Sequence, residues 1–253
     1  MATYKKRGKG SGKSREEKIE QRSAIARLFG RLDFIASSFE DWVSRNRVAL
    51  FSIIGVIVIG VLGYLAYDNF ILQPRQEEAV KEMSDPLDYF DRALQADAGA
   101  DRDELFDKAL HGAGGFGLLD IVENYKGTDA ANLANYAVGV SYLQRMEYDK
   151  AVQYLEKFKS KDEFLAAVAK GAIGDAFVGN NQPEEALSYY EEAANIRTND
   201  FTTPKYLLKA GILAIQIGQK DKAKIFLERI ENEYPESTEA QKVSAYLGMV
   251  QSN

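Results

Sequence analysis

The hydrophobic pattern is dominated by one uncharged segment, residues 48–67, with the sequence VALFSIIGVIVIGVLGYLAY. As an α-helix its twenty residues would be about 30 Å long, which is the thickness of the hydrocarbon core of a membrane. A soluble core helix would carry charged residues on its outer side, and the segment is also longer than the apolar region of a typical signal peptide. The pattern therefore predicts a single transmembrane helix over residues 48–67.

Residues 15–47, which precede this segment, have a different apolar pattern. Their apolar residues recur every three or four positions, as on one face of a helix, and Arg27 and Arg31 flank that face. The face consists of Ile25, Leu28, Phe29, Leu32, Ile35, Phe39, Trp42 and Val43. Such a helix suits the cytoplasmic membrane surface or a protein partner; both interpretations stay open, and the membrane surface is slightly favoured.

Charge predicts the orientation of the membrane helix. Residues 1–47 hold 12 Lys and Arg against 6 Asp and Glu, whereas the rest of the chain holds 20 against 32, a net charge of −12. Basic residues collect on the cytoplasmic side of membrane helices. We therefore expect a cytoplasmic N-terminus, with a disordered basic tail over residues 1–14, and an acidic domain across the membrane. The acidic charge argues against nucleic acid as a partner on that side.

The small residues of the apolar segment lie on one side of the predicted helix. At about 100° per residue, they fall within an arc of roughly 140°, although Val56 and Ile59 share that arc. Small residues let helices approach closely in lipid. The predicted packing positions are Ser52, Gly55, Gly60 and Gly63. Two interpretations stay open: a docking face for a membrane partner, and glycines that a membrane helix tolerates without a role.

The region after the apolar segment contains a repeat. Three units carry an alanine before a large apolar residue, and these alanines, Ala151, Ala186 and Ala223, are 35 and 37 residues apart. Each unit also has a glycine in its first half, at Gly139, Gly174 and Gly211, twelve residues before its alanine. We expect each glycine to pack against its alanine where two helices cross, which leaves room for an aromatic residue at the next turn.

This pattern resembles the tetratricopeptide repeat, a helix-turn-helix of 34 residues. The resemblance covers residues 132–236 and predicts an all-α fold, in which the transmembrane helix is followed by a tetratricopeptide-like α-solenoid. The match is degenerate, because no unit has the family's tryptophan and Pro183 and Ala214 stand where aromatic residues are usual. Residues 75–131 are predicted to be a divergent helical region with a polar loop at 96–103, and residues 238–250 a helix that caps the array within the repeat domain 132–253.

The family resemblance also implies a binding surface, because the first helix of each pair lines the inner face of such arrays. By that register, the inner face is apolar, with few polar members such as Asp175. Its predicted residues are Leu133, Tyr136, Val140, Leu143, Val168, Val178, Leu208, Ile212 and Ile215. Either this face is a groove for an apolar segment of another protein, or neighbouring helices of the array cover it.

Candidate chemistry is sparse, and we expect no catalytic residue, cofactor or metal site. The stretch GKGSGKS (8–14) resembles a phosphate-binding loop, but its first glycine is one position too close and no strand precedes it. The chain has no cysteine, and His111 is its only histidine. The glycines of HGAGGFG (111–117) lack the strand–helix context of a dinucleotide site. The sequence therefore favours a binding protein over an enzyme.

Taken together, a cytoplasmic N-terminus, one membrane helix and an outer degenerate repeat domain resemble the YfgM-type ancillary subunit of the bacterial Sec translocon. The resemblance covers residues 48–250 at the level of architecture. It implies an inner-membrane protein with a periplasmic domain, whose partners would be the Sec channel, a periplasmic chaperone and emerging unfolded clients. The 47-residue N-terminal extension departs from that family. The alternative function is a structural scaffold of an envelope assembly, such as a secretion or motility machine.

Overall fold

The computed structural model describes residues 42–251. The chain divides into two units, Met1–Tyr67 and Asp68–Asn253, and each is described by itself below. The predicted basic tail 1–14, and the amphipathic segment 15–47 as far as residue 41, lie outside the described residues.

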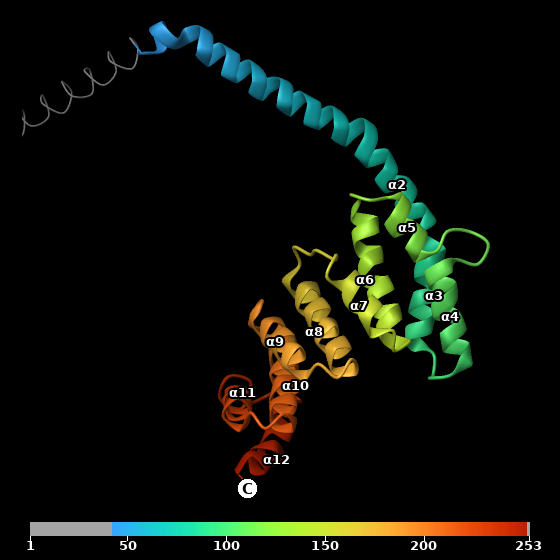
Figure 1. The fold of residues 1–253 in the computed structure, drawn as a ribbon, viewed down its shortest axis with the longest axis vertical. Coiled ribbons are helices and arrows are strands. Elements are labelled where there is room, and N and C mark those ends of the chain that lie inside the picture. The colour runs from blue at the N-terminus through green and yellow to red at the C-terminus, as the bar shows by residue number, and fades with distance from the viewer. Residues whose placement is uncertain (1–41, 252–253) are drawn as a thin grey trace, which may run out of the picture. The chain divides into compact units, whose positions relative to one another are not determined.

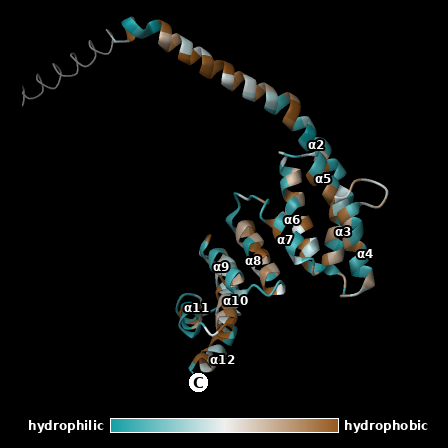
Figure 2. Cartoon of the chain, viewed as in Figure 1, coloured by the Kyte–Doolittle hydropathy of each residue, from teal (hydrophilic) through white to brown (hydrophobic). Residues whose placement is uncertain are grey.

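The apolar segment 48–67 is helical throughout, inside a helix that runs from Trp42 to Glu82. This helix is long and apolar enough to cross a membrane. The large apolar side chains of the segment, such as Phe51, Ile57 and Leu62, are exposed, and Figure 2 shows them as one hydrophobic stretch. An apolar surface of this extent is unfavourable in water. Within residues 42–251, no other part of the chain covers the segment.

The second unit begins with a single π-helical turn, η1 (Asp68–Leu72), and continues as α2 (Gln73–Glu82). The next helices are α3 (Ser84–Gln95), α4 (Ala100–His111) and α5 (Leu118–Asn124) (Figure 1). The predicted polar loop at 96–103 is wrong in its second half, because α4 already begins at Ala100. Asp101 and Asp103 lie in its first turn, where carboxylates interact favourably with the positive end of the helix dipole.

Three helical hairpins follow, in the order that the repeat predicts. They are α6 (Asp129–Gln144) with α7 (Tyr148–Leu155), α8 (Glu163–Gly179) with α9 (Pro183–Asn195), and α10 (Thr202–Gln216) with α11 (Lys220–Glu233). The helix α12 (Ala240–Gln251) packs on α10 and α11. The all-α solenoid fold is thus confirmed, and the described residues contain no strand.

Local signals in the sequence explain where several of these helices begin. The Thr128 hydroxyl accepts a hydrogen bond from the backbone N–H of Ala131 and so caps α6. The Asp162 carboxylate caps α8 by accepting from the N–H groups of Phe164 and Leu165. Pro183 stands in the first turn of α9, where its missing N–H costs nothing. This position explains the proline that departs from the usual repeat pattern.

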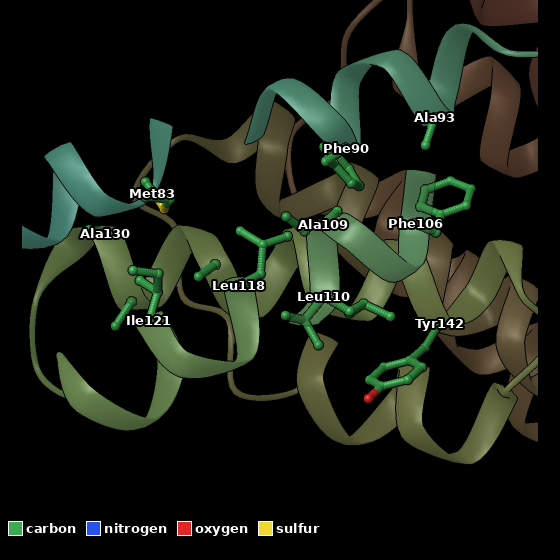
Figure 3. Close-up of a cluster of buried hydrophobic side chains, with 14 of the residues drawn as sticks. Met83, Phe90, Ala93, Phe106, Ala109, Leu110, Leu118, Ile121, Ala130 and Tyr142 are labelled. Carbon is green, nitrogen blue, oxygen red and sulfur yellow. The ribbon is translucent and has the colours of Figure 1, made fainter. Parts of the chain in front are cut away.

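Two clusters of buried apolar side chains stabilise the second unit. One joins α2–α5 to the first hairpin; in the close-up of Figure 3, Phe90, Phe106 and Tyr142 are among its residues. The other joins the second and third hairpins to α12 through side chains such as Leu207 and Val243. Each hairpin therefore buries its apolar face against its neighbours, as expected of a solenoid.

Candidate protein-interaction surface

The crossing point of each hairpin is set by a glycine in its first helix. A Cβ atom at Gly139 would lie 2.6 Å from Leu155 Cγ, and one at Gly174 would lie 2.6 Å from Tyr190 Cε1. At Gly211 the nearest atom would be Leu227 Cδ2, at 3.0 Å. These partners lie four residues after the repeat alanines. The predicted role of the glycines in close packing is therefore correct, and the nearest atoms belong to the residue one turn after the alanine; at Gly211 the carbonyl oxygen of Ala223 also lies at 3.8 Å.

The turn inside each hairpin is the second structural feature that recurs with the same spacing. Met146, Asn181 and Gly218 all have positive φ angles, of 62°, 58° and 76°. After each of them, a backbone N–H returns to a carbonyl five residues earlier, as from Glu147 to Tyr142, with N–O distances of 2.8–2.9 Å across the three turns. This left-handed turn ends the first helix and reverses the chain.

These features define the second unit as an α-solenoid built from antiparallel helix pairs. The second and third hairpins also match tetratricopeptide repeat family models, over residues 167–200 and 205–237. The first hairpin, which neither match includes, shares their glycine contact and their left-handed turn. No curated protein and no solved structure matches the chain.

The structure places all nine predicted inner-face residues on the first helices of the three hairpins, α6, α8 and α10. Eight of them are partly or well exposed, including Leu133 at 37% and Val178 at 43%. Leu208 differs, because it is only 7% exposed and belongs to the second core cluster. We define the inner surface as the other eight residues: Leu133, Tyr136, Val140, Leu143, Val168, Val178, Ile212 and Ile215.

A shallow depression of about 170 Å³ brings two of these residues together. Val178 of α8 and Ile212 of α10 line it with Tyr190, Lys209 and Gln216. Its lining is mostly apolar, with Lys209 and Gln216 as polar members. Tyr136, another residue of the inner surface, packs against an aromatic side chain instead: its ring centroid lies 5.3 Å from that of Phe158.

A polar network joins the second and third hairpins beside this depression. Lys209 Nζ lies 2.5 and 2.8 Å from the two carboxylate oxygens of Asp175. The hydroxyl of Tyr190 donates to the same carboxylate at 2.6 Å, and the rings of Tyr190 and Tyr206 stack at 6.4 Å. Burial, and next the negative charge of Asp175, raise the pKa of both tyrosines. The network thus holds α8, α9 and α10 in register on the inner surface.

Sequence reasoning identified Asp175 but missed its cation. Lys209 stands 34 residues later, about one repeat length, and this spacing is the signal that could have found it. Residues one repeat apart occupy equivalent positions on neighbouring first helices, so opposite charges there can pair across the solenoid.

The structure also places the candidate chemistry considered in the sequence. No group of three His, Asp or Glu side chains among the described residues is placed to hold a metal ion. His111 lies at the end of α4 on the surface, with Nε2 3.8 Å from Asp107. The glycine run after it forms the connection to α5, with positive φ at Gly112 and Gly114. What the arrangement offers chemically is an apolar surface with one fixed charged pair, which suits binding.

Proposed function

We propose that this protein is a membrane-anchored, non-enzymatic protein-binding factor of the bacterial envelope. In this proposal residues 48–67 cross the inner membrane, the N-terminus is cytoplasmic and the solenoid is periplasmic. The solenoid assists export, either as an ancillary subunit of the Sec translocon or as a chaperone-type factor that holds emerging chains. Tetratricopeptide repeats suggest protein–protein interaction, and the observation that carries the proposal is the partly exposed apolar inner surface.

The chemistry of that surface supports an apolar segment of another protein as the ligand. Val178 and Ile212 offer side chains that a partner can cover, and burying apolar surface contributes about 25 cal/mol per Å². The side-chain amide of Gln216 at the same depression can form hydrogen bonds with the backbone of the partner. An unfolded chain presents both kinds of group, which matches a role in holding clients.

The partners can be identified by purifying the full-length protein in a mild detergent and analysing what accompanies it by mass spectrometry. Recovery of the Sec channel and of periplasmic chaperones is expected. Recovery of the components of a secretion or motility machine instead would favour the alternative role as a scaffold. A reporter fused after Asn253 should be active outside the cytoplasm, and activity inside it would refute the proposed topology.

The inner surface can be tested with one charge substitution and its matched control. Val178→Asp should weaken binding of an unfolded client protein at least several-fold, because it places a carboxylate in the apolar depression. Ile225→Asp is the control, since Ile225 lies on α11 outside the inner surface and is 62% exposed. Equal binding by both variants would show that the inner surface is not the client site. Leu208 is unsuitable for this test, because a charge at a buried position would unfold the domain.

A further inference from the structure

A second cleft, with a volume of about 920 Å³, opens at the end of the solenoid where α6 begins. It lies between the α5–α6 connection, the first turns of α6 and the α7–α8 connection. Its floor is apolar, and its rim is basic. The floor is formed by Val122, Leu133, Phe158 and Leu165, and the rim carries Lys126, Lys157, Lys159 and Lys161, with Asp129 as the one acidic residue in the lining.

The four rim lysines differ from most lysines of the solenoid. Within the described chain, none of them has a carboxylate within 4 Å, whereas six others are paired: Lys108, Lys150, Lys170, Lys209, Lys222 and Lys224. Lys157 lies over the ring of Tyr154, at 4.6 Å, a cation–π contact that stabilises its charge without a carboxylate. The second unit as a whole has 20 basic against 32 acidic residues. The rim is thus a concentrated positive site on an acidic domain.

The cleft is held in shape by hydrogen bonds between its two sides. The side chain of Asn132 on α6 accepts from the backbone N–H of Lys159 at 2.8 Å and donates to its carbonyl at 2.6 Å. These bonds fix the backbone of the α7–α8 connection against α6 at Lys159, so this wall of the cleft is formed before any ligand arrives, and preorganisation favours affinity. In the wall, Asn135 donates to the carbonyl of Ala131, but its buried Oδ1 accepts no hydrogen bond.

We propose that this lysine-rimmed cleft binds an extended acidic segment of a partner protein that also carries apolar side chains. The lysines would pair with its carboxylates, and an apolar side chain would cover Leu133 and Leu165. A phosphate or lipid headgroup would use the lysines alone and leave the apolar floor uncovered. The cleft shares Leu133 with the inner surface, but its lysines lie outside that surface, so the inference goes beyond the proposed function by assigning a second ligand chemistry.

The test uses the full-length protein in an uncharged detergent and a short fluorescent peptide of alternating glutamate and leucine. Fluorescence anisotropy should show saturable binding that weakens as salt is added, because salt screens exposed charges. A peptide with lysine in place of glutamate, and one with serine in place of leucine, should both bind much more weakly. The variant K159E/K161E should bind the acidic peptide roughly tenfold more weakly, which is about what the loss of two exposed ion pairs predicts.

The matched control is K81E/K242E, which changes the net charge equally. Within the described chain Lys81 and Lys242 also lack ion pairs, and neither lines this cleft. Equal weakening by both variants would overturn the proposal, because the overall charge of the protein would then explain the binding without the cleft. Absence of peptide binding, with lysine-dependent binding of short-chain phosphatidylglycerol instead, would also overturn it in favour of lipid. No envelope partner is used, so these outcomes are independent of the proposed function.

Discussion

Glycine has opposite surroundings in the two units of this chain. In the solenoid, a Cβ atom at Gly139 or Gly174 would collide with the second helix of its own hairpin. In the apolar helix, a Cβ at Gly55, Gly60 or Gly63 would meet nothing within 4 Å beyond the helix itself. Packing within the described residues therefore requires glycine in the solenoid, whereas no contact within residues 42–251 requires it in the apolar helix.

The two regions differ in how far the chain itself buries their apolar side chains. The hairpins bury their repeat alanines completely, as at Ala151 and Ala186, and the core that results is made by the chain alone. The apolar helix leaves side chains such as Ile54 and Leu62 exposed, so the described part of the chain does not bury them. A membrane covers them in the function proposed above, and a partner helix could then use the small residues.

The comparison is tested most directly by introducing the same side chain into both regions. Gly174→Val should destabilise the solenoid by about 2–3 kcal/mol, because overpacking a well-filled crossing has a cost of this size. The neighbouring Tyr190 ring cannot easily move, since its hydroxyl is bonded to Asp175. Thermal unfolding of the full-length protein in detergent, followed by circular dichroism, measures the effect.

Gly60→Val is the matched control and should leave the unfolding of the solenoid unchanged. If Gly174→Val were equally harmless, the crossing would be looser than the structure places it. If Gly60→Val reduced recovery of the membrane partners while the solenoid stayed folded, the docking interpretation of Ser52, Gly55, Gly60 and Gly63 would gain support over glycines without a role.

The packing rule of the solenoid was visible in the sequence because it depends on residue size. Glycines and alanines that recur after 35 and 37 residues predicted the three hairpins and their order. The identity of the contact was not visible, since the offset between two crossing helices decides whether Gly139 contacts Ala151 or Leu155. Sequence spacing within one helix carries no information about that offset.

The inner surface was predictable to a similar degree. The repeat register placed its residues on the first helices, but it could not distinguish Leu208 from Ile212. Leu208 is a buried member of the second core cluster, whereas Ile212 is only partly buried against it, and this depends on how α10 is rotated relative to its neighbours. The lysine-rimmed cleft was not predictable, because its residues come from two connections that only the fold brings together.

The second prediction compares two positions that share one conformation. Gly218→Ala should cost about 1 kcal/mol, because a left-handed φ is unfavourable for any residue with a Cβ. Met146→Gly should gain a smaller amount, about 0.5 kcal/mol, since Met146 has the same conformation and its side chain is 72% exposed. Chemical denaturation of both variants gives the two free energies. Changes of the same sign would contradict a shared turn geometry.

A third substitution addresses the polar network that joins two hairpins. Lys209→Met keeps the apolar stem and removes the charge, and it should destabilise the solenoid by about 0.5–1 kcal/mol, as expected for a half-exposed ion pair. Lys222→Met is its control, because that lysine meets Glu191 only at 3.5 Å. If the control were the more destabilising change, the Asp175 network would have no special part in holding the hairpins together.

Alkaline pH should destabilise the solenoid but not the apolar helix, and this is the smallest of the expected effects. Burial, and next a hydrogen bond to Glu156, raise the pKa of Tyr189 to about 12, whereas an unfolded tyrosine loses its proton near pH 10. Between these values the folded state keeps a proton that the unfolded state has lost, so the free energy of unfolding of the solenoid must fall as the pH rises.

Tyr189→Phe retains the stacking on Phe177, whose ring lies 5.2 Å away, and removes this titration. Its stability should therefore fall less between pH 10 and 12 than that of the unaltered protein, while the helical signal of the apolar segment in detergent stays constant. An equal fall in both proteins would show that Tyr189 ionises as readily in the folded solenoid as in the unfolded chain.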